Sequence, residues 1–90
     1  VSKTNFVKQN YPNPFNPETI ITFSLQKPAI VSLKIYDLLG KEVKTLIDGI
    51  VKSGEHKIKF SAADIPAGVY YYTLKTSNGT SETKKMVLVK

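Results

Sequence analysis

The sequence contains no cysteine and no arginine, and each absence narrows the kinds of site that it can hold. Without cysteine, neither a disulfide framework nor a cysteine-based metal or catalytic site can form. Arginine is the side chain that most often recognises bases and phosphates through paired hydrogen bonds, so its absence argues against specific nucleic-acid binding. No apolar run approaches the ~18 residues of a membrane-spanning helix, so we expect no membrane insertion.

Lysine alone carries the positive charge: 13 lysines stand against seven acidic residues, for a net charge of +6 over 90 residues. A chain of this length is one domain. Most lysines are dispersed and alternate with apolar residues, as in KIKF at residues 57–60. This spacing is typical of solvated strand faces and protected sheet edges, although binding to a polyanion stays an alternative. Only Lys84, Lys85 and Lys90 form a local excess, because no acidic residue follows Glu82.

Catalysis requires titratable side chains that converge, and the sequence offers few of them. His56 is the only histidine and lies in phase with Ile58 and Phe60, so we expect it to pack rather than to react. The acidic residues are spread singly, mostly at predicted turns, and suggest no acid–base pair. We therefore predict a protein that is not an enzyme and that holds no metal and no cofactor.

Apolar residues recur at every second position, which is the period of a β-strand. The alternation predicts strands at residues 19–25, 31–36, 43–47, 56–60, 69–76 and about 80–89, with an optional edge strand at 6–9. Turn signals at 39–41, at Asp48-Gly49 and at Asn78-Gly79 separate them, and no segment is convincingly helical. The spacing of these turns favours an all-β fold, an Ig-like antiparallel β-sandwich of about seven strands.

The segment NYPNPFNP at residues 10–17 differs from the rest because it holds three prolines in eight positions. Proline restricts its own φ and the residue before it, so we expect this segment to be stiff and extended. Tyr11 and Phe15 are costly to leave in water, and we expect both to hold the segment against the sandwich. A simple linker is the alternative.

The run Tyr70-Tyr71-Tyr72 is the one feature suited to binding a small ligand. Tyr70 and Tyr72 share a strand face with Leu74, and we expect this face to be core with the hydroxyl groups at its rim. Tyr71 points the other way. It could form a stacking surface for a sugar together with Tyr36, although core packing is the favoured role of the run.

Four blocks, in this order, carry a resemblance to a known family: YPNPFNPETIITFSL, VSLKIYDLLGKEVKTLI, IPAGVYYYTL and TKKMVLVK. Together they resemble the type A C-terminal sorting domain of the type IX secretion system, which is found on exported proteins of Bacteroidetes and related phyla. The resemblance covers residues 10–90, so residues 1–9 are expected to end a linker from a preceding cargo domain. The Ig-like domain of the flagellar hook-capping protein shares the PNPFNP motif, but the KKMVLVK ending favours the sorting domain.

The resemblance implies a non-catalytic secretion signal for an N-terminally fused cargo protein. Its partners would be an outer-membrane translocon, a shuttle protein and a surface sortase that cuts upstream of Tyr11. The cargo would pass through the periplasm and then be secreted or held at the cell surface. By the same analogy, the recognised residues would be Pro66, Gly68, Tyr70, Lys84, Lys85, Met86, Val87, Leu88, Val89 and Lys90, with Asn13, Pro14, Phe15, Asn16 and Pro17 as the first motif.

A folded signal must be recognised at an exposed edge or groove. The last predicted strand suits recognition by strand addition to a receptor, with its lysines preventing self-pairing. The alternative is a strand that only completes a sheet. Two other functions stay open: a structural Ig-like module of a hook scaffold or adhesin, and a carbohydrate-binding accessory module.

Overall fold

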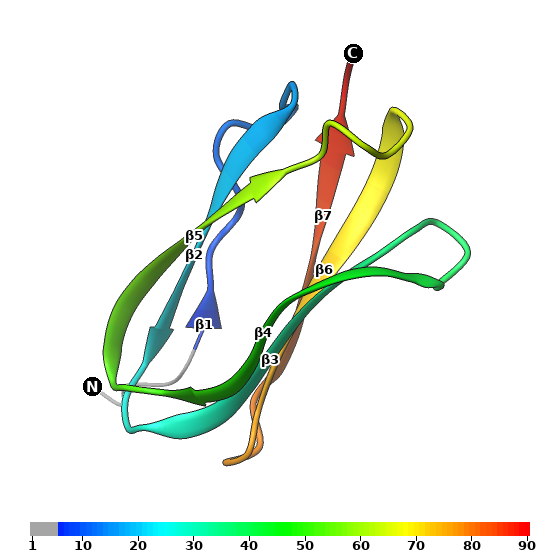
Figure 1. Ribbon diagram of the computed structural model, residues 1–90. Coiled ribbons are helices and arrows are strands. Elements are labelled where there is room, and N and C mark those ends of the chain that lie inside the picture. Colours follow the sequence, from blue (N-terminus) through cyan, green and yellow to red (C-terminus); the bar gives the residue numbers. More distant parts are fainter. Residues whose placement is uncertain (1–5) are drawn as a thin grey trace.

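The computed structural model describes residues 6–90, which form two antiparallel sheets packed face to face (Figure 1). The strands are β1 Phe6–Val7, β2 Glu18–Leu25, β3 Ala29–Tyr36, β4 Glu42–Val51, β5 Gly54–Ser61, β6 Gly68–Thr76 and β7 Ser81–Leu88. One sheet has the order β1-β2-β5 and the other β4-β3-β6-β7. Residues 6–90 include no helix, and so none that is long and apolar enough to cross a membrane. The predicted seven-stranded, all-β sandwich is confirmed, and β1 is the optional edge strand.

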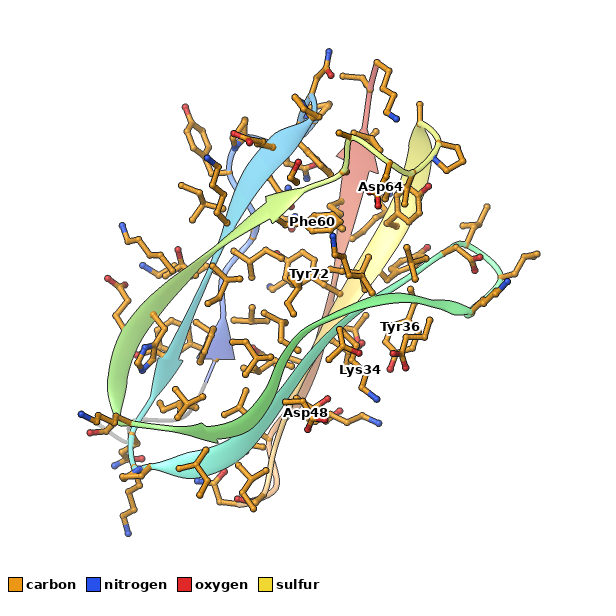
Figure 2. All side chains as sticks on the ribbon, viewed as in Figure 1. Lys34, Tyr36, Asp48, Phe60, Asp64 and Tyr72 are labelled. Carbon is orange, nitrogen blue, oxygen red and sulfur yellow. The ribbon has the colours of Figure 1, made fainter. Side chains whose placement is uncertain are left out.

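The core lies between the sheets and follows the predicted alternation. In β2 and β3, every second side chain is buried, beginning with Thr19 in β2 and Ala29 in β3. Figure 2 shows Phe60 and Tyr72 between the sheets, whereas Lys34 lies on the outer face. Burial of each large apolar side chain stabilises the fold by about 1.5–3 kcal/mol relative to leaving it exposed.

Strand β4 is longer than the sequence predicts, and the prediction of a turn at Asp48-Gly49 is wrong. Asp48 is paired with Ser32 and Gly49 with Val31, so both residues lie within the ladder. Two register shifts along β3 keep the strands aligned, and the chain turns after Val51 instead. Ladder hydrogen bonds satisfy the buried backbone groups, and this outweighs the local turn preference of Asp-Gly.

The predicted hairpin at Asn78-Gly79 is confirmed and joins β6 to β7. Gly79 has a φ of 104°, which other residues rarely adopt. The Thr76 amide donates to the carbonyl of Thr80 at 2.9 Å, which closes the turn. The hairpin places β7 at one edge of the four-stranded sheet.

Candidate functional site

Phe15 joins the proline-rich segment to the edge of β7. Its ring is 1% exposed and lies in the core, 6.1 Å from the ring of Phe60. The Phe15 amide donates to the carbonyl of Val87, and the Val89 amide donates to the carbonyl of Phe15, each at 2.9 Å. The segment is therefore part of the fold at this point and not a simple linker.

Tyr11 does not share the predicted role of Phe15, because its side chain is 81% exposed. Its backbone holds the segment instead. The amide and carbonyl of Tyr11 both bond to Ile20 of β2, at 3.0 Å. The expectation that both aromatic rings hold the segment is thus wrong for Tyr11, since its amide and carbonyl pair with β2 while its side chain extends into solvent.

The segment is also bent rather than extended as predicted. Tyr11 pairs with β2 of one sheet and Phe15 pairs with β7 of the other, so the chain must turn to reach both. The peptide bonds before Pro12, Pro14 and Pro17 are cis. Residues 11–15 therefore connect the two sheets.

Asn10 is a structural residue that sequence reasoning missed. Its buried amide donates to the carbonyl of Pro12 and to the hydroxyl of Thr19, both at 3.0 Å. The Thr19 hydroxyl in turn donates to the Pro12 carbonyl at 2.8 Å. The only available signal was the tendency of asparagine to bond the backbone two residues further on.

The outer edge of β7 is bonded to the N-terminal residues along much of its length. Besides the Phe15 bonds, the Val87 amide donates to the side-chain oxygen of Asn13 at 2.9 Å. The side chain of Gln9 donates to the Lys85 carbonyl at 2.6 Å. An incoming strand can pair with this stretch only after the proline-rich segment leaves it.

The side chains of β7 divide between the two faces of the sheet. Met86 and Leu88 are buried in the core. Lys85 and Val87 face outward, whereas Lys84 is half-buried opposite Tyr72, in phase with the core residues. Lys84 and Lys85, which the resemblance groups together, therefore lie on opposite faces.

The last residue also makes defined contacts. The Lys90 ammonium donates to the carbonyl of Ala63, at 3.2 Å, and to that of Ile65, both in the loop between β5 and β6. In the same region the Tyr70 hydroxyl donates to the Pro66 carbonyl at 2.5 Å. This lysine thus holds the chain end against the loop that carries one of the predicted motifs.

Most of the predicted recognition residues meet at one end of the sandwich, where the C-terminus lies (Figure 1). Phe15 is bridged to Leu88, and Gly68 is paired with the same residue from the other side. We call this end the C-terminal pole and define it as residues 13–17, 66–70 and 86–90. Lys84 and Lys85 lie further along β7, outside the pole.

The structure raises the pKa of two tyrosines of β6. Burial, and then the nearby Asp37 carboxylate, raises the pKa of Tyr70. Burial raises the pKa of Tyr72 to about 12, and its hydroxyl donates to the Lys8 carbonyl at 2.6 Å. Both rings belong to the core, as predicted for this face, and both hydroxyls act as neutral hydrogen-bond donors.

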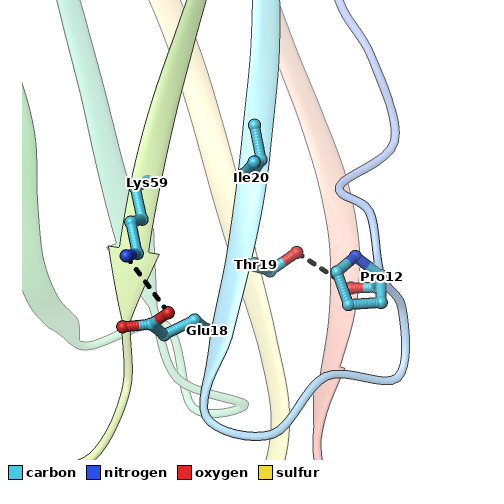
Figure 3. A pocket seen from close by; sticks show the side chains of 5 residues that line it. All are labelled: Pro12, Glu18, Thr19, Ile20 and Lys59. Carbon is cyan, nitrogen blue, oxygen red and sulfur yellow. Dashed lines mark hydrogen bonds and ion pairs between the residues drawn. The ribbon is translucent and has the colours of Figure 1, made fainter.

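Chemistry-bearing groups do not converge in the described part of the chain. The His56 ring is stacked on Phe23, with 5.2 Å between the ring centroids, and its Nε2 lies 2.8 Å from the Lys52 carbonyl. Among residues 6–90, no three His, Cys, Asp or Glu side chains are grouped as metal ligands would be. A hollow of about 360 Å³ on β2 and β5 has its one charged pair, Lys59 and Glu18, joined at 3.2 Å (Figure 3).

The described residues form a small β-sandwich module whose last strand is bonded to its own proline-rich segment. Comparison with protein families identifies the module: residues 9–90 match the secretion system C-terminal sorting domain. The chain therefore belongs to that family, the type IX sorting domains, as the resemblance implied. Such domains mark a cargo protein for secretion or the cell surface, and they are in general not catalysts. No curated protein matches the chain.

Proposed function

We propose that this domain is a non-catalytic signal that takes an N-terminally fused cargo from the periplasm through the outer-membrane translocon. A shuttle protein and a surface sortase are the further partners, and the sortase removes the domain upstream of Tyr11. The observation that carries the proposal is the convergence of the family motifs on the C-terminal pole, through the contacts of Leu88 with Phe15 and Gly68.

The surface of the pole supports recognition of the folded domain. Asn13, Pro14, Asn16 and Pro17 are exposed around the buried Phe15, and Val89 is 44% exposed beside them. These residues come from both ends of the domain, so their arrangement exists only when the sandwich is folded. A receptor that contacts the pole would therefore distinguish folded cargo tags from unfolded ones.

The test is a fusion of residues 1–90 to a periplasmic reporter in a host with a working type IX system. We expect the reporter in the medium or on the cell surface. The matched control is the same fusion in a strain without the translocon, where the reporter should stay in the periplasm. A reporter that stays inside the competent host, although its tag resists proteolysis, contradicts the proposal.

The effect of Lys85 on export can be measured separately from its effect on the stability of the fold. Deletion of residues 84–90 removes the buried Met86 and Leu88 and so confounds export with folding. Lys85→Ala removes only an exposed ammonium group, and Lys75→Ala is its control on the outer face of the same sheet. We expect weaker export for Lys85→Ala alone; equal export of both variants would limit Lys85 to a role in solubility.

One observation favours a second candidate function, carbohydrate binding. Tyr36 and Tyr71 are direct cross-strand neighbours and both are half-buried on the outer face. The Thr45 hydroxyl and then Lys34 lower the pKa of Glu42, which is the other cross-strand neighbour of Tyr36. Two adjacent rings and a carboxylate suit a sugar. A polysaccharide that raises the melting temperature of the wild-type domain, but not that of the Tyr71→Ala variant, would support this function.

A further inference from the structure

The turn between β3 and β4 exposes two leucines next to the C-terminal pole. Leu38 is 66% exposed and Leu39 is 92% exposed. A hollow of about 270 Å³ lies between them and the start of β6. Ala67, Gly68, Val69 and Tyr70 line it on the side of β6, and Asp37 lines it beside the leucines. Exposed apolar side chains grouped around a hollow mark interaction sites in soluble proteins more often than single exposed residues do.

Hydrogen bonds hold these leucines away from the core. One carboxylate oxygen of Asp37 accepts from the amides of Leu39 and Lys41, each at 2.9 Å. The Gly40 amide donates to the Asp37 carbonyl at 3.0 Å, and Gly40 has a φ of 87°. The leucines are thus held in a defined position, which lowers the conformational-entropy cost of ordering the turn when a partner binds.

The apolar surface continues onto the outer face of the sheet. Val69, which lines the hollow, is paired with Val87 of β7, and both are half-buried. Lys85 is the nearest lysine on the same face of β7, two residues from Val87, and Lys41 directly follows the turn, with its amide bonded to Asp37. The ion pairs seen among residues 6–90 involve the lysines at 8, 34 and 59. Lys41 and Lys85 are thus not neutralised by ion pairs there.

We propose that this Leu38–Leu39 surface, formed by Leu38, Leu39, Val69 and Val87 between Lys41 and Lys85, binds a protein of the export machinery. The matching face of that protein is apolar at its centre and carries carboxylates at its rim, because the lysines flank the leucines. This inference rests on the proposed function and identifies the face of the domain that the machinery contacts. The surface adjoins the pole at Gly68, so one partner can contact both.

The test compares two pairs of exposed apolar residues on the same sheet. Leu38→Ser with Leu39→Ser changes the proposed surface. Ile30→Ser with Ile50→Ser is the control, since these cross-strand partners are 56% and 81% exposed at the opposite end of the sheet. In the reporter fusion we expect the leucine variant to lose export about tenfold or more, as for loss of an anchoring contact, while the control stays within about twofold of wild type.

The outcomes separate this inference from the proposed function. A wild-type fusion that is not exported rejects the proposed function, whereas normal export of both wild type and the leucine variant rejects only the Leu38–Leu39 surface. Resistance of the fusion to limited proteolysis reports folding. If the double variant is degraded, Leu39→Asp replaces it, because this side chain is almost fully exposed.

A separate pair of charge-reversal variants tests whether export depends on Lys41 and Lys85. Lys41→Glu with Lys85→Glu should reduce export in the same assay, because the variant repels the carboxylates of the partner. Lys75→Glu, on the same outer face but towards the other end of the sheet, should not reduce it. Equal export of the two charge variants would reject an acidic rim on the partner.

Discussion

Phe15 and Leu88 are neighbours in a parallel bridge, although one lies before β2 and the other ends β7. Each side chain is 1% exposed, so the bridge joins two core residues as well as two backbones. It also covers the edge of the four-stranded sheet, which would otherwise offer unpaired amides and carbonyls to other chains. The bridge therefore serves both the stability of the domain and the protection of its last strand.

Phe15→Ala should destabilise the domain by about 3–5 kcal/mol, because it removes a buried ring and leaves a cavity. Tyr11→Ala is the matched control in the same segment, and its effect should stay within about 0.5 kcal/mol because the ring is exposed. Urea unfolding of both variants measures the difference. Equal destabilisation would mean that Phe15 is not anchored in the core.

The stability of the domain should fall at alkaline pH through Tyr72. The pKa of this buried phenol is about 12, above its ordinary value of 10.0, so between these values the folded state binds more protons than the unfolded state. The stabilisation is complete below pH 10 and is lost as pH rises towards 12. Tyr72→Phe cannot show this loss. Unfolding free energies measured at pH 8 and pH 11 should therefore differ less in the variant than in wild type.

Two glycine variants test the extended β4 strand. Gly49 lies in the ladder without a positive φ and with open space around its Cα, so Gly49→Ala should stabilise the domain by about 0.4–1 kcal/mol. Gly79, at a φ of 104°, should respond oppositely and lose about 1–2 kcal/mol on change to Ala. Thermal unfolding measures both. If Gly49→Ala destabilises as much as Gly79→Ala, the Asp48-Gly49 turn exists after all.

Lys90→Ala should loosen the loop between β5 and β6 with little effect on the whole fold. The variant removes two donated hydrogen bonds, to Ala63 and Ile65, from an exposed side chain. Hydrogen exchange of the Ile65 amide, which donates to the Ala62 carbonyl at 3.3 Å, should become faster. The global stability should change by no more than about 1 kcal/mol. Unchanged exchange relative to Lys75→Ala would show that Lys90 does not order the loop.

The parts of the fold that depend on short-range pattern could be predicted. The alternation around Ile21, Val31 and Tyr72 identified the core faces, because side chains in a strand point to opposite sides at every step. The hairpin at Asn78-Gly79 was predictable for a related reason, since Gly79 has a φ of 104° and few residues other than glycine adopt such an angle.

The errors occurred where distant segments compete with local preference. Asp48-Gly49 has a turn sequence, but pairing with β3 keeps it in a strand. Tyr11 and Phe15 are both aromatic and only four residues apart, yet only Phe15 lies against the sandwich core. No property of these residues considered alone distinguishes the two outcomes.

The amino-acid sequence by itself determined the β-sandwich, its inward-facing residues and its family, because alternation, turn residues and motif order are local properties. The tertiary structure alone decided that the proline-rich segment covers the edge of β7 and that Leu38 and Leu39 stand beside the C-terminal pole. The physical reason is that backbone hydrogen bonds between segments depend on how the two sheets are packed. Neither composition nor periodicity records that arrangement.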